Sequence, residues 1–146
     1  MEIPELVKKH NGFESFNPMQ EKALAAGLLD KNMVVSAPTA SGKTVLAELA
    51  ALNCILNKRK KVVYTCPLRA LASEHSHDFK EKYAQELGIR PVLSTGDLDS
   101  SGANLLRKDI IYTTFEKLNS LINHKTEWLS EIGLLVVDEI HTIGSD

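Results

Sequence analysis

The hydrophobic positions along the chain fall into short apolar runs that alternate with longer, partly polar segments. The short runs are typical of buried strands, and they occupy residues 33–37, 61–66, 91–95, 109–114 and 133–139. Helical patterns occupy residues 43–56, 68–87 and 115–123, and Gly88 is placed to end the second helix as a C-cap. This alternation of strands and helices predicts an α/β fold.

The predicted strands are apolar almost throughout rather than at every second position, and the last one, "GLLVVDE", is predicted to be fully buried. Such strands are typical of a mostly parallel sheet that helices cover on both faces. We therefore predict a doubly wound sheet with ligand sites beyond the carboxyl ends of its strands. Ahead of the first strand, "FNPMQEKALAAGLL" predicts another helix, with Asn17 as N-cap and Pro18 at the first helical position.

The charge of the chain is nearly balanced, with 17 basic and 19 acidic residues among 146. This balance argues against a polybasic coat for nucleic acid, but it permits local contacts through backbone amides and helix N-termini. The length suits one domain at most. No apolar run has the length of a signal peptide or a membrane span. Cys54 and Cys66 are interpreted as free buried thiols, and we expect a cytoplasmic protein, associated with the nucleoid if it is prokaryotic.

The segment "APTASGKT" follows a predicted strand and opens a predicted helix. That is the setting of a phosphate-binding loop, whose amides and helix N-terminus present positive dipoles to a triphosphate. Gly42 lets the backbone approach phosphate, Lys43 is expected to reach the β- and γ-phosphates, and Thr44 is expected to give its hydroxyl to Mg²⁺. The alternative is a chance G-K-T at a helix start. The predicted ATP-binding segment consists of Ala37, Pro38, Thr39, Ala40, Ser41, Gly42, Lys43 and Thr44.

Two acids, Asp138 and Glu139, end the last predicted strand. The phosphate-loop strand and this strand would both be parallel and would end on the same side of the sheet. Asp138 can therefore hold the Mg²⁺ near Thr44, and Glu139 can orient or deprotonate the attacking water. The alternative is that the two acids cap a helix or face solvent. The upstream G-K-T favours the catalytic interpretation.

The motifs, taken in order, resemble those of the superfamily 2 helicases of the DExH-box group. "APTASGKT" and "DEIH" match its ATP motifs, and "FNPMQ" resembles the Q motif, in which Gln20 would read the adenine edge. "PLRALASEH", "STGD" and "TTFEK" resemble the elements that grip the nucleic-acid backbone. The resemblance covers Gly12 to Asp146 and implies a RecA-like fold that uses ATP and Mg²⁺.

The resemblance also assigns roles to individual residues. Lys43, Asp138, Glu139 and His141 are implied to be catalytic, with His141 coupling the nucleotide state to the grip on nucleic acid. The residues implied to contact nucleic acid are Pro67, Arg69, Ala70, Thr95, Gly96, Asp97, Thr114 and Glu116.

Within this family the chain is most similar to the Ski-like branch, particularly to archaeal repair helicases that unwind branched DNA at stalled forks. This similarity implies a partner that is single-stranded or branched nucleic acid, with DNA favoured over RNA and a 3′ to 5′ polarity. RNA helicases of the same branch remain an alternative.

The motor of this family has two RecA-like domains with ATP between them, and residues 1–146 match only the first. The resemblance further implies a strand with a "SAT"-type motif between the phosphate-loop strand and the DExH strand, and no such motif is present. We therefore expect an incomplete first RecA-like domain that needs the C-terminal part of the same protein. On its own it should hydrolyse ATP very slowly, because arginine fingers are contributed by the second domain.

The residue types near the predicted strand ends suit a sequence-independent grip. Thr95, Thr113 and Thr114 at strand ends, with Arg69 at a helix start, can bind phosphates of any sequence. Helix capping is the alternative for each threonine. The basic run Asn57–Lys61 precedes a strand, so it is interpreted as a solvated turn at the opposite, amino edge of the sheet.

Some aromatic and histidine residues have a structural interpretation. Trp128 is predicted to pack a helix onto the sheet. Phe13 and Phe16 could each lie near the adenine or pack the N-terminal helix. His75 and His77 are two apart on a predicted helix, so they point to different faces.

Two other classes of function are weighed. A small P-loop kinase or GTPase is disfavoured because the chain has no guanine-reading N-K-x-D and no Arg-rich lid segment after the loop. A non-catalytic module with a vestigial nucleotide site would retain its function after substitution of Lys43 and Glu139.

Overall fold

The computed structural model describes residues 2–33, 42–94, 107–123 and 127–138. The chain divides into two compact units, residues 1–59 (unit 1) and residues 60–146 (unit 2), and each is described by itself. The predicted first strand, over residues 33–37, lies almost wholly outside the described residues. The other four predicted strands are all present, in unit 2.

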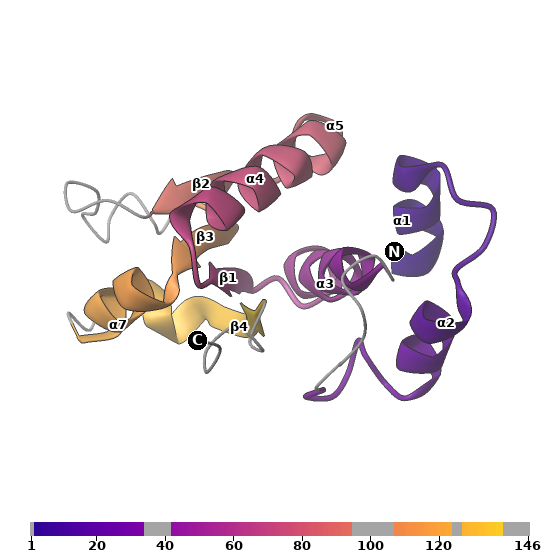
Figure 1. Ribbon diagram of the computed structural model, residues 1–146, viewed down its shortest axis with the longest axis horizontal. Coiled ribbons are helices and arrows are strands. Elements are labelled where there is room, and N and C mark those ends of the chain that lie inside the picture. Colours follow the sequence, from indigo (N-terminus) through magenta and orange to yellow (C-terminus); the bar gives the residue numbers. More distant parts are fainter. Residues whose placement is uncertain (1, 34–41, 95–106, 124–126, 139–146) are drawn as a thin grey trace. The chain divides into compact units, whose positions relative to one another are not determined.

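The described part of unit 1 is helical (Figure 1). Its helices are α1 (Ile3–Asn11), α2 (Pro18–Ala25) and α3 (Lys43–Leu52), and α3 continues as a π-helical turn, η2 (Asn53–Asn57). The prediction of a helix from residue 43 is confirmed, although its last turn is π-helical. The core of this unit includes Ile3, Val7, Leu49 and Leu52, each no more than 1% exposed.

The start of α2 is fixed by a capping box, as the prediction of Asn17 as N-cap required. The Asn17 side chain accepts a hydrogen bond from the Gln20 amide at 2.9 Å, and the Asn17 amide donates to Gln20 Oε1 at 3.0 Å. Pro18 occupies the first turn, where its missing N–H costs nothing. Two backbone donors that the helix leaves unpaired are thus satisfied by side chains.

Replacing Asn17 with alanine is expected to destabilise α2 by about 1 kcal/mol, because the capping oxygen is lost. Faster hydrogen exchange of the α2 amides would report the loss. Asn17→Ser keeps a capping oxygen and is the matched control, so its exchange should stay close to that of the unmodified protein. Equal acceleration in both variants would contradict the assignment of the effect to the cap.

The described residues of unit 2 form a four-stranded, all-parallel sheet in the order β2-β3-β1-β4. Its strands are β1 (Lys61–Cys66), β2 (Pro91–Ser94), β3 (Ile110–Thr114) and β4 (Ile132–Val137). β1 and β3 lie in the middle, where Tyr64 is paired with Tyr112 and Cys66 with Thr114. Each strand lies within two residues of its predicted bounds, and the predicted parallel α/β architecture is confirmed.

Helices cover both faces of this sheet (Figure 1). One face carries α4 (Arg69–Phe79), which continues through a π-helical segment, η3 (Lys80–Ala84), into α5 (Gln85–Leu87) and ends at Gly88 with φ 69°. The aromatic rings of Tyr64, Tyr112, Phe79 and Tyr83 form a chain of ring contacts with centroids 5.0–6.2 Å apart. The rings therefore join α4 and η3 to the two central strands.

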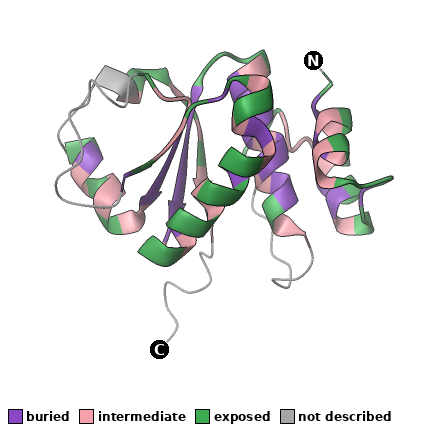
Figure 2. Ribbon diagram, turned by 90° about the horizontal axis from the view of Figure 1, so that it is seen from above, coloured by how far each residue is buried: buried purple, intermediate pink, exposed green. Residues whose placement is uncertain are grey.

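The opposite face is covered by α7 (Phe115–Asn123), together with the 3₁₀ segment η4 (Glu127–Glu131). Val63, Ile111 and Leu121 form the buried centre of this layer, packed against Leu118, Leu129 and other partly buried apolar side chains. Figure 2 shows β1 and β3 as buried along most of their length. The side chain of Trp128, predicted to pack in this region, lies outside the described residues.

The prediction that the last strand is fully buried is wrong. Among the described residues, β4 has one strand neighbour, β1, and its residues alternate between half-buried and exposed. Leu135 is 51% exposed and Val137 40% exposed. These two residues pair with Val63 and Thr65 of β1, on the face where α7 packs, but α7 lies chiefly over β3 and β1. Apolar composition therefore did not mean burial at this edge.

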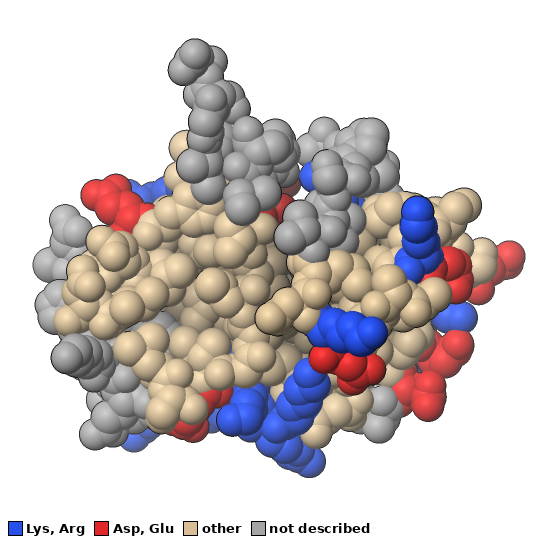
Figure 3. Space-filling view, turned by 90° about the horizontal axis from the view of Figure 1, so that it is seen from below, with Lys and Arg blue, Asp and Glu red and all other residues tan. Residues whose placement is uncertain are grey.

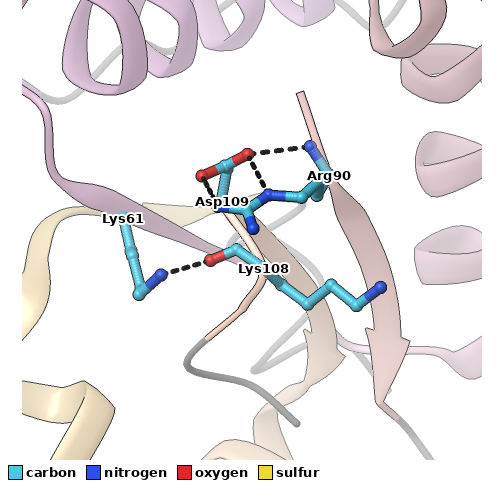
Figure 4. Close-up of polar contacts among 4 residues, drawn as sticks. All are labelled: Lys61, Arg90, Lys108 and Asp109. Atoms are coloured by element: carbon cyan, nitrogen blue, oxygen red, sulfur yellow. Dashed lines mark hydrogen bonds and ion pairs between the residues drawn. The ribbon is translucent and has the colours of Figure 1, made fainter. Parts of the chain in front are cut away.

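The amino edge of the sheet corrects part of the interpretation of the basic run. Lys61 is 7% exposed rather than solvated, because it is already in β1, and its Nζ donates to the Lys108 carbonyl at 2.6 Å (Figure 4). Beside it, Asp109 accepts from the Arg90 amide at 2.9 Å and from the Arg90 guanidinium at 3.2–3.3 Å. These bonds hold the starts of β1, β2 and β3 together.

The expectations for thiols and for membrane spans can also be compared with the structure. Cys54 and Cys66 are both buried thiols outside any disulfide, as predicted. Among the described residues, no helix has the length and apolar character that crossing a membrane requires.

Candidate functional site

The described part of the predicted phosphate loop is Gly42, Lys43 and Thr44, while Ala37 to Ser41 lie outside the described residues. Gly42 is the N-cap of α3 and has φ 92°, a left-handed conformation that favours glycine. Among the described residues, no side chain makes a capping hydrogen bond to this helix. Lys43 and Thr44 therefore open α3 at an N-terminus whose amide dipoles suit an anion such as a phosphate group.

Gln20 connects α2 to this loop. Besides its part in the capping box, its Nε2 donates to the Gly42 carbonyl at 3.2 Å, and the residue is only 3% exposed. Two features favour glycine at residue 42. Its φ is positive, and a Cβ there would collide with the side-chain amide of Gln20. The sequence indicated Gln20 as an adenine reader and Asn17 as a cap, but not the bond that ties Gln20 to the loop.

The two phenylalanines considered for adenine differ in exposure. Phe16 is 8% exposed, and the Lys8 ammonium lies 5.6 Å from the centre of its ring. Phe13 is 39% exposed. Phe16 therefore packs within unit 1, where it is buried and makes a cation–π contact. Phe13, in contrast, is accessible.

Asp138 directly follows β4, where its amide donates to the Thr65 carbonyl of β1 at 3.0 Å. Its carboxylate lies on the α4 side of the sheet. There Oδ2 accepts a hydrogen bond from the Tyr64 hydroxyl at 2.9 Å and lies 3.0 Å from Nε2 of His75. The Asp138 side chain is 19% exposed and that of His75 16%. A carboxylate oxygen at an accessible strand end fits Mg²⁺, which prefers oxygen ligands.

Burial and the Asp138 carboxylate shift the pKa values of Tyr64 and His75. Burial, and then the charge of Asp138, raises the pKa of Tyr64 well above its ordinary value, so the hydroxyl stays protonated and can donate. The hydrogen bond to Asp138 raises the pKa of His75, against the opposing effect of burial. The Asp138 carboxylate thus contributes to both shifts.

Sequence reasoning missed the roles of Tyr64 and His75, although it separated the two histidines of α4 correctly. His75 faces Asp138, while the His77 side chain is 69% exposed and lies 3.8 Å from Glu81. Ligand atoms of Cys66, His75 and Asp138 lie within 4.8 Å of one another. Thiolate and imidazole suit softer metals than Mg²⁺, so this trio lends no support to the predicted magnesium site.

Those predicted nucleic-acid residues of unit 2 that the structure describes lie at the same edge of the sheet. α4 begins after β1, where Arg69 and Ala70 are exposed and Pro67 is half-buried. α7 begins directly after β3, where Glu116 is exposed. Because β1 and β3 are paired up to Cys66 and Thr114, the two helix starts are neighbours at the carboxyl edge.

The strand-end threonines have structural roles. Thr114 caps α7, since its Oγ1 accepts a hydrogen bond from the Lys117 amide at 3.2 Å. Thr113 is fully buried, and its hydroxyl donates to the Ser94 carbonyl at 2.7 Å, so the suggestion that it binds phosphate is wrong. The predicted contact residues Thr95, Gly96 and Asp97, and the predicted catalytic residues Glu139 and His141, lie outside the described residues.

Charge on the surface agrees with the balanced composition. On the face drawn in Figure 3, basic and acidic side chains lie close to one another and leave a broad area without charged groups. The described surface in this view therefore has no continuous basic stripe. A grip on nucleic acid would depend on local groups such as Arg69 and helix N-termini rather than on a general positive field.

Comparison with known families decides between the classes of function that the motifs left open. The model of the DEAD/DEAH box helicases matches residues 17–146, which include the phosphate loop, the start of α4 and Asp138. The chain belongs to the DEAD/DEAH box helicase family.

Individual relatives agree with the family. The chain is 45% identical to the ATP-dependent DNA helicase Hel308 of Thermococcus kodakarensis, over 95% of this chain and 12% of that protein. It is 43% identical to Hel308 of Pyrococcus abyssi, over 95% of this chain and 19% of that protein. The crystal structure of the DUF1998 helicase MrfA bound to DNA and AMPPNP matches with a TM-score of 0.78 and 26% identity, over 97% of this chain and 21% of that one. The chain therefore spans between 12% and 21% of the length of these proteins.

These findings confirm the predicted resemblance and the RecA-like class of fold. They bear on the family and not on single residues, so the roles of Lys43, Asp138 and the nucleic-acid contacts stay predictions. The α4 and α7 starts and Asp138 form one edge of unit 2, and the phosphate-loop residues belong to unit 1.

Proposed function

We propose that this chain is the ATP-binding motor domain of an ATP-dependent DNA helicase that translocates 3′ to 5′ and acts on branched or single-stranded DNA of the replication-fork type. The observation that carries the proposal is the carboxyl edge of the sheet in unit 2. Asp138 after β4, α4 after β1 and α7 after β3 all lie at this edge, where parallel α/β sheets bind their ligands. Because the chain belongs to a helicase family, we propose that the ligands at this edge are ATP and nucleic acid.

For ATP, we propose that Lys43 and the loop from Ala37 to Thr44 bind the phosphates and that Gln20 recognises adenine. The uncapped start of α3, with Gly42 left-handed and held by Gln20, supports this assignment. Thr44 and Asp138 would hold Mg²⁺, and Glu139 would orient the hydrolytic water. When bound, the metal neutralises charge that develops on the transferred phosphoryl group.

For nucleic acid, we propose that the neighbouring starts of α4 and α7 grip the backbone. Arg69 offers charge, and the first amides of both helices offer donors that bind phosphate without reading sequence. The proposed contacts extend to Pro67, Ala70, Thr95, Gly96, Asp97, Thr114 and Glu116. Two relatives favour DNA over RNA as the partner. The structure of MrfA has DNA bound, and Hel308 is named as a DNA helicase.

We further propose that these residues work with a second RecA-like domain of the same protein. That domain would contribute arginine fingers, worth about 10³–10⁵ in rate in other phosphoryl-transfer enzymes, and His141 would couple the nucleotide to the grip on DNA. The support is that the chain spans only 12% of the Thermococcus relative's length. Such a protein would work in the cytoplasm, at the nucleoid if it is prokaryotic.

The test is ATP hydrolysis by the complete protein with and without nucleic acid. We expect single-stranded and forked DNA to stimulate hydrolysis by at least tenfold, and RNA of the same sequence to stimulate it less. If only RNA stimulates hydrolysis, the protein is an RNA helicase and the proposal of a DNA helicase is wrong. Phosphorylation of nucleoside monophosphates, with no response to nucleic acid, would overturn it.

A further inference from the structure

We propose that Tyr64 and His75 are positioning residues that hold the Asp138 carboxylate in its metal-binding orientation. The inference rests on the proposed function, because it takes Asp138 as a ligand of the Mg²⁺ that accompanies ATP. It assigns a role beside Asp138 to two residues for which the sequence indicated none, one in the middle of β1 and one on the second turn of α4.

Two donors from different elements converge on one oxygen of this carboxylate. The Tyr64 hydroxyl is 2.9 Å from Asp138 Oδ2, and His75 Nε2 is 3.0 Å from the same atom. A carboxylate on a single strand can rotate about its side-chain bonds, and each rotamer turns its oxygens in a new direction. Two bonds to Oδ2 oppose that rotation, and they thereby also set the direction of the other oxygen, Oδ1.

The donors are themselves held in place. Tyr64 is 4% exposed, and its ring lies between Tyr112, with centroids 5.0 Å apart, and His75, with centroids 5.2 Å apart. His75 is on α4, which packs over β1 and β3. A functional group keeps its geometry when its neighbours have packed, locked rotamers, and both donors meet that condition.

A simpler role is that the three residues only join α4 to the sheet. Asp138 is partly exposed and could be satisfied by water, so joining does not require two protein donors on one oxygen. The two roles differ in what is lost with a donor. If the donor only attaches α4 to the sheet, its removal lowers stability. If it orients a metal ligand, its removal typically weakens metal affinity or activity by about 10–100-fold.

The test measures binding of Mn²⁺, a paramagnetic substitute for Mg²⁺, to the complete protein with a non-hydrolysable ATP analogue, by electron paramagnetic resonance. Tyr64→Phe removes only the hydroxyl, and His75→Ala removes the imidazole. We expect each to weaken Mn²⁺ binding by about tenfold or more. The Mg²⁺ concentration for half-maximal ATP hydrolysis should rise in parallel, with kcat at saturating Mg²⁺ much less affected. His75→Gln, which retains a donor, should restore part of the affinity.

His77→Ala is the matched control on the same helix, since that side chain is 69% exposed and faces away from Asp138. It should leave Mn²⁺ affinity unchanged. If Tyr64→Phe and His75→Ala lower the unfolding temperature but bind Mn²⁺ like the unmodified protein, the two residues are structural and the inference is overturned. Tyr64→Phe keeps the packed ring, so it tests the inference even if His75→Ala does not fold.

Asp138→Asn separates this inference from the proposed function. If Asp138→Asn binds Mn²⁺ normally, Asp138 is not a ligand, and the proposed function loses its metal site together with the inference. If Asp138→Asn weakens binding while Tyr64→Phe and His75→Ala do not, only the positioning role fails.

Discussion

Replacing Lys43 with alanine is expected to reduce DNA-stimulated ATP hydrolysis by the complete protein by about 10²–10³-fold, the usual cost of removing one preorganised group that stabilises transition-state charge. Lys43 is the first residue of α3, directly after the left-handed Gly42. Its ammonium would meet the β- and γ-phosphates, and no other lysine or arginine follows in this helix. Steady-state hydrolysis at saturating DNA measures the effect.

The matched control for this experiment is Lys22→Ala. Lys22 is an exposed lysine in α2 of the same unit, so its loss removes one charge without touching the loop. Its rate should remain close to that of the unmodified protein. Glu139→Gln should also slow hydrolysis while ATP still binds. If both Lys43→Ala and Glu139→Gln unwind DNA normally, the nucleotide site is vestigial and the motor assignment fails.

Replacing Tyr112 with alanine is expected to destabilise the sheet of unit 2 by about 3–5 kcal/mol, the usual cost of truncating a buried aromatic side chain. Tyr112 is 1% exposed in the central strand β3, and its ring lies 5.0 Å from that of Tyr64 and 6.2 Å from that of Phe79, between centroids. The truncation leaves a cavity between the sheet and α4. Hydrogen exchange of the β3 amides resolves the loss locally, even in a protein of several domains.

Ile122→Ala is the control for the truncation. Ile122 is 46% exposed on α7, and substitutions at exposed sites usually change stability by about 0.5 kcal/mol or less. Exchange of the β3 amides should then be almost unchanged. Similar losses in the two variants would mean that the aromatic contacts between β3 and α4 do not hold this layer together.

The sequence by itself determined most of the local structure and the family. The apolar run "KVVYTC" predicted a strand that is β1 to the residue, and the predicted helix over residues 115–123 is α7. Asn17 with Gln20 predicted the start of α2, which a capping box confirms. These features were readable because they depend on neighbours in the chain, whose spacing fixes both the hydrophobic period and the cap. The motif residues were sufficient for the family because they occur in a fixed order.

Only the tertiary structure decided which residues are covered by other elements and which side chains are hydrogen-bond partners. The pattern of β4 was as apolar as that of β1, yet in the described part of the sheet β4 is an outer strand and leaves Leu135 and Val137 exposed. Likewise, nothing local to Asp138 indicated that Tyr64 and His75 would be its partners. Hydrophobic patterning records that a residue tends to be buried but not which element covers it. Strand order and side-chain partners across the sheet are set by contacts between segments that are distant in the chain.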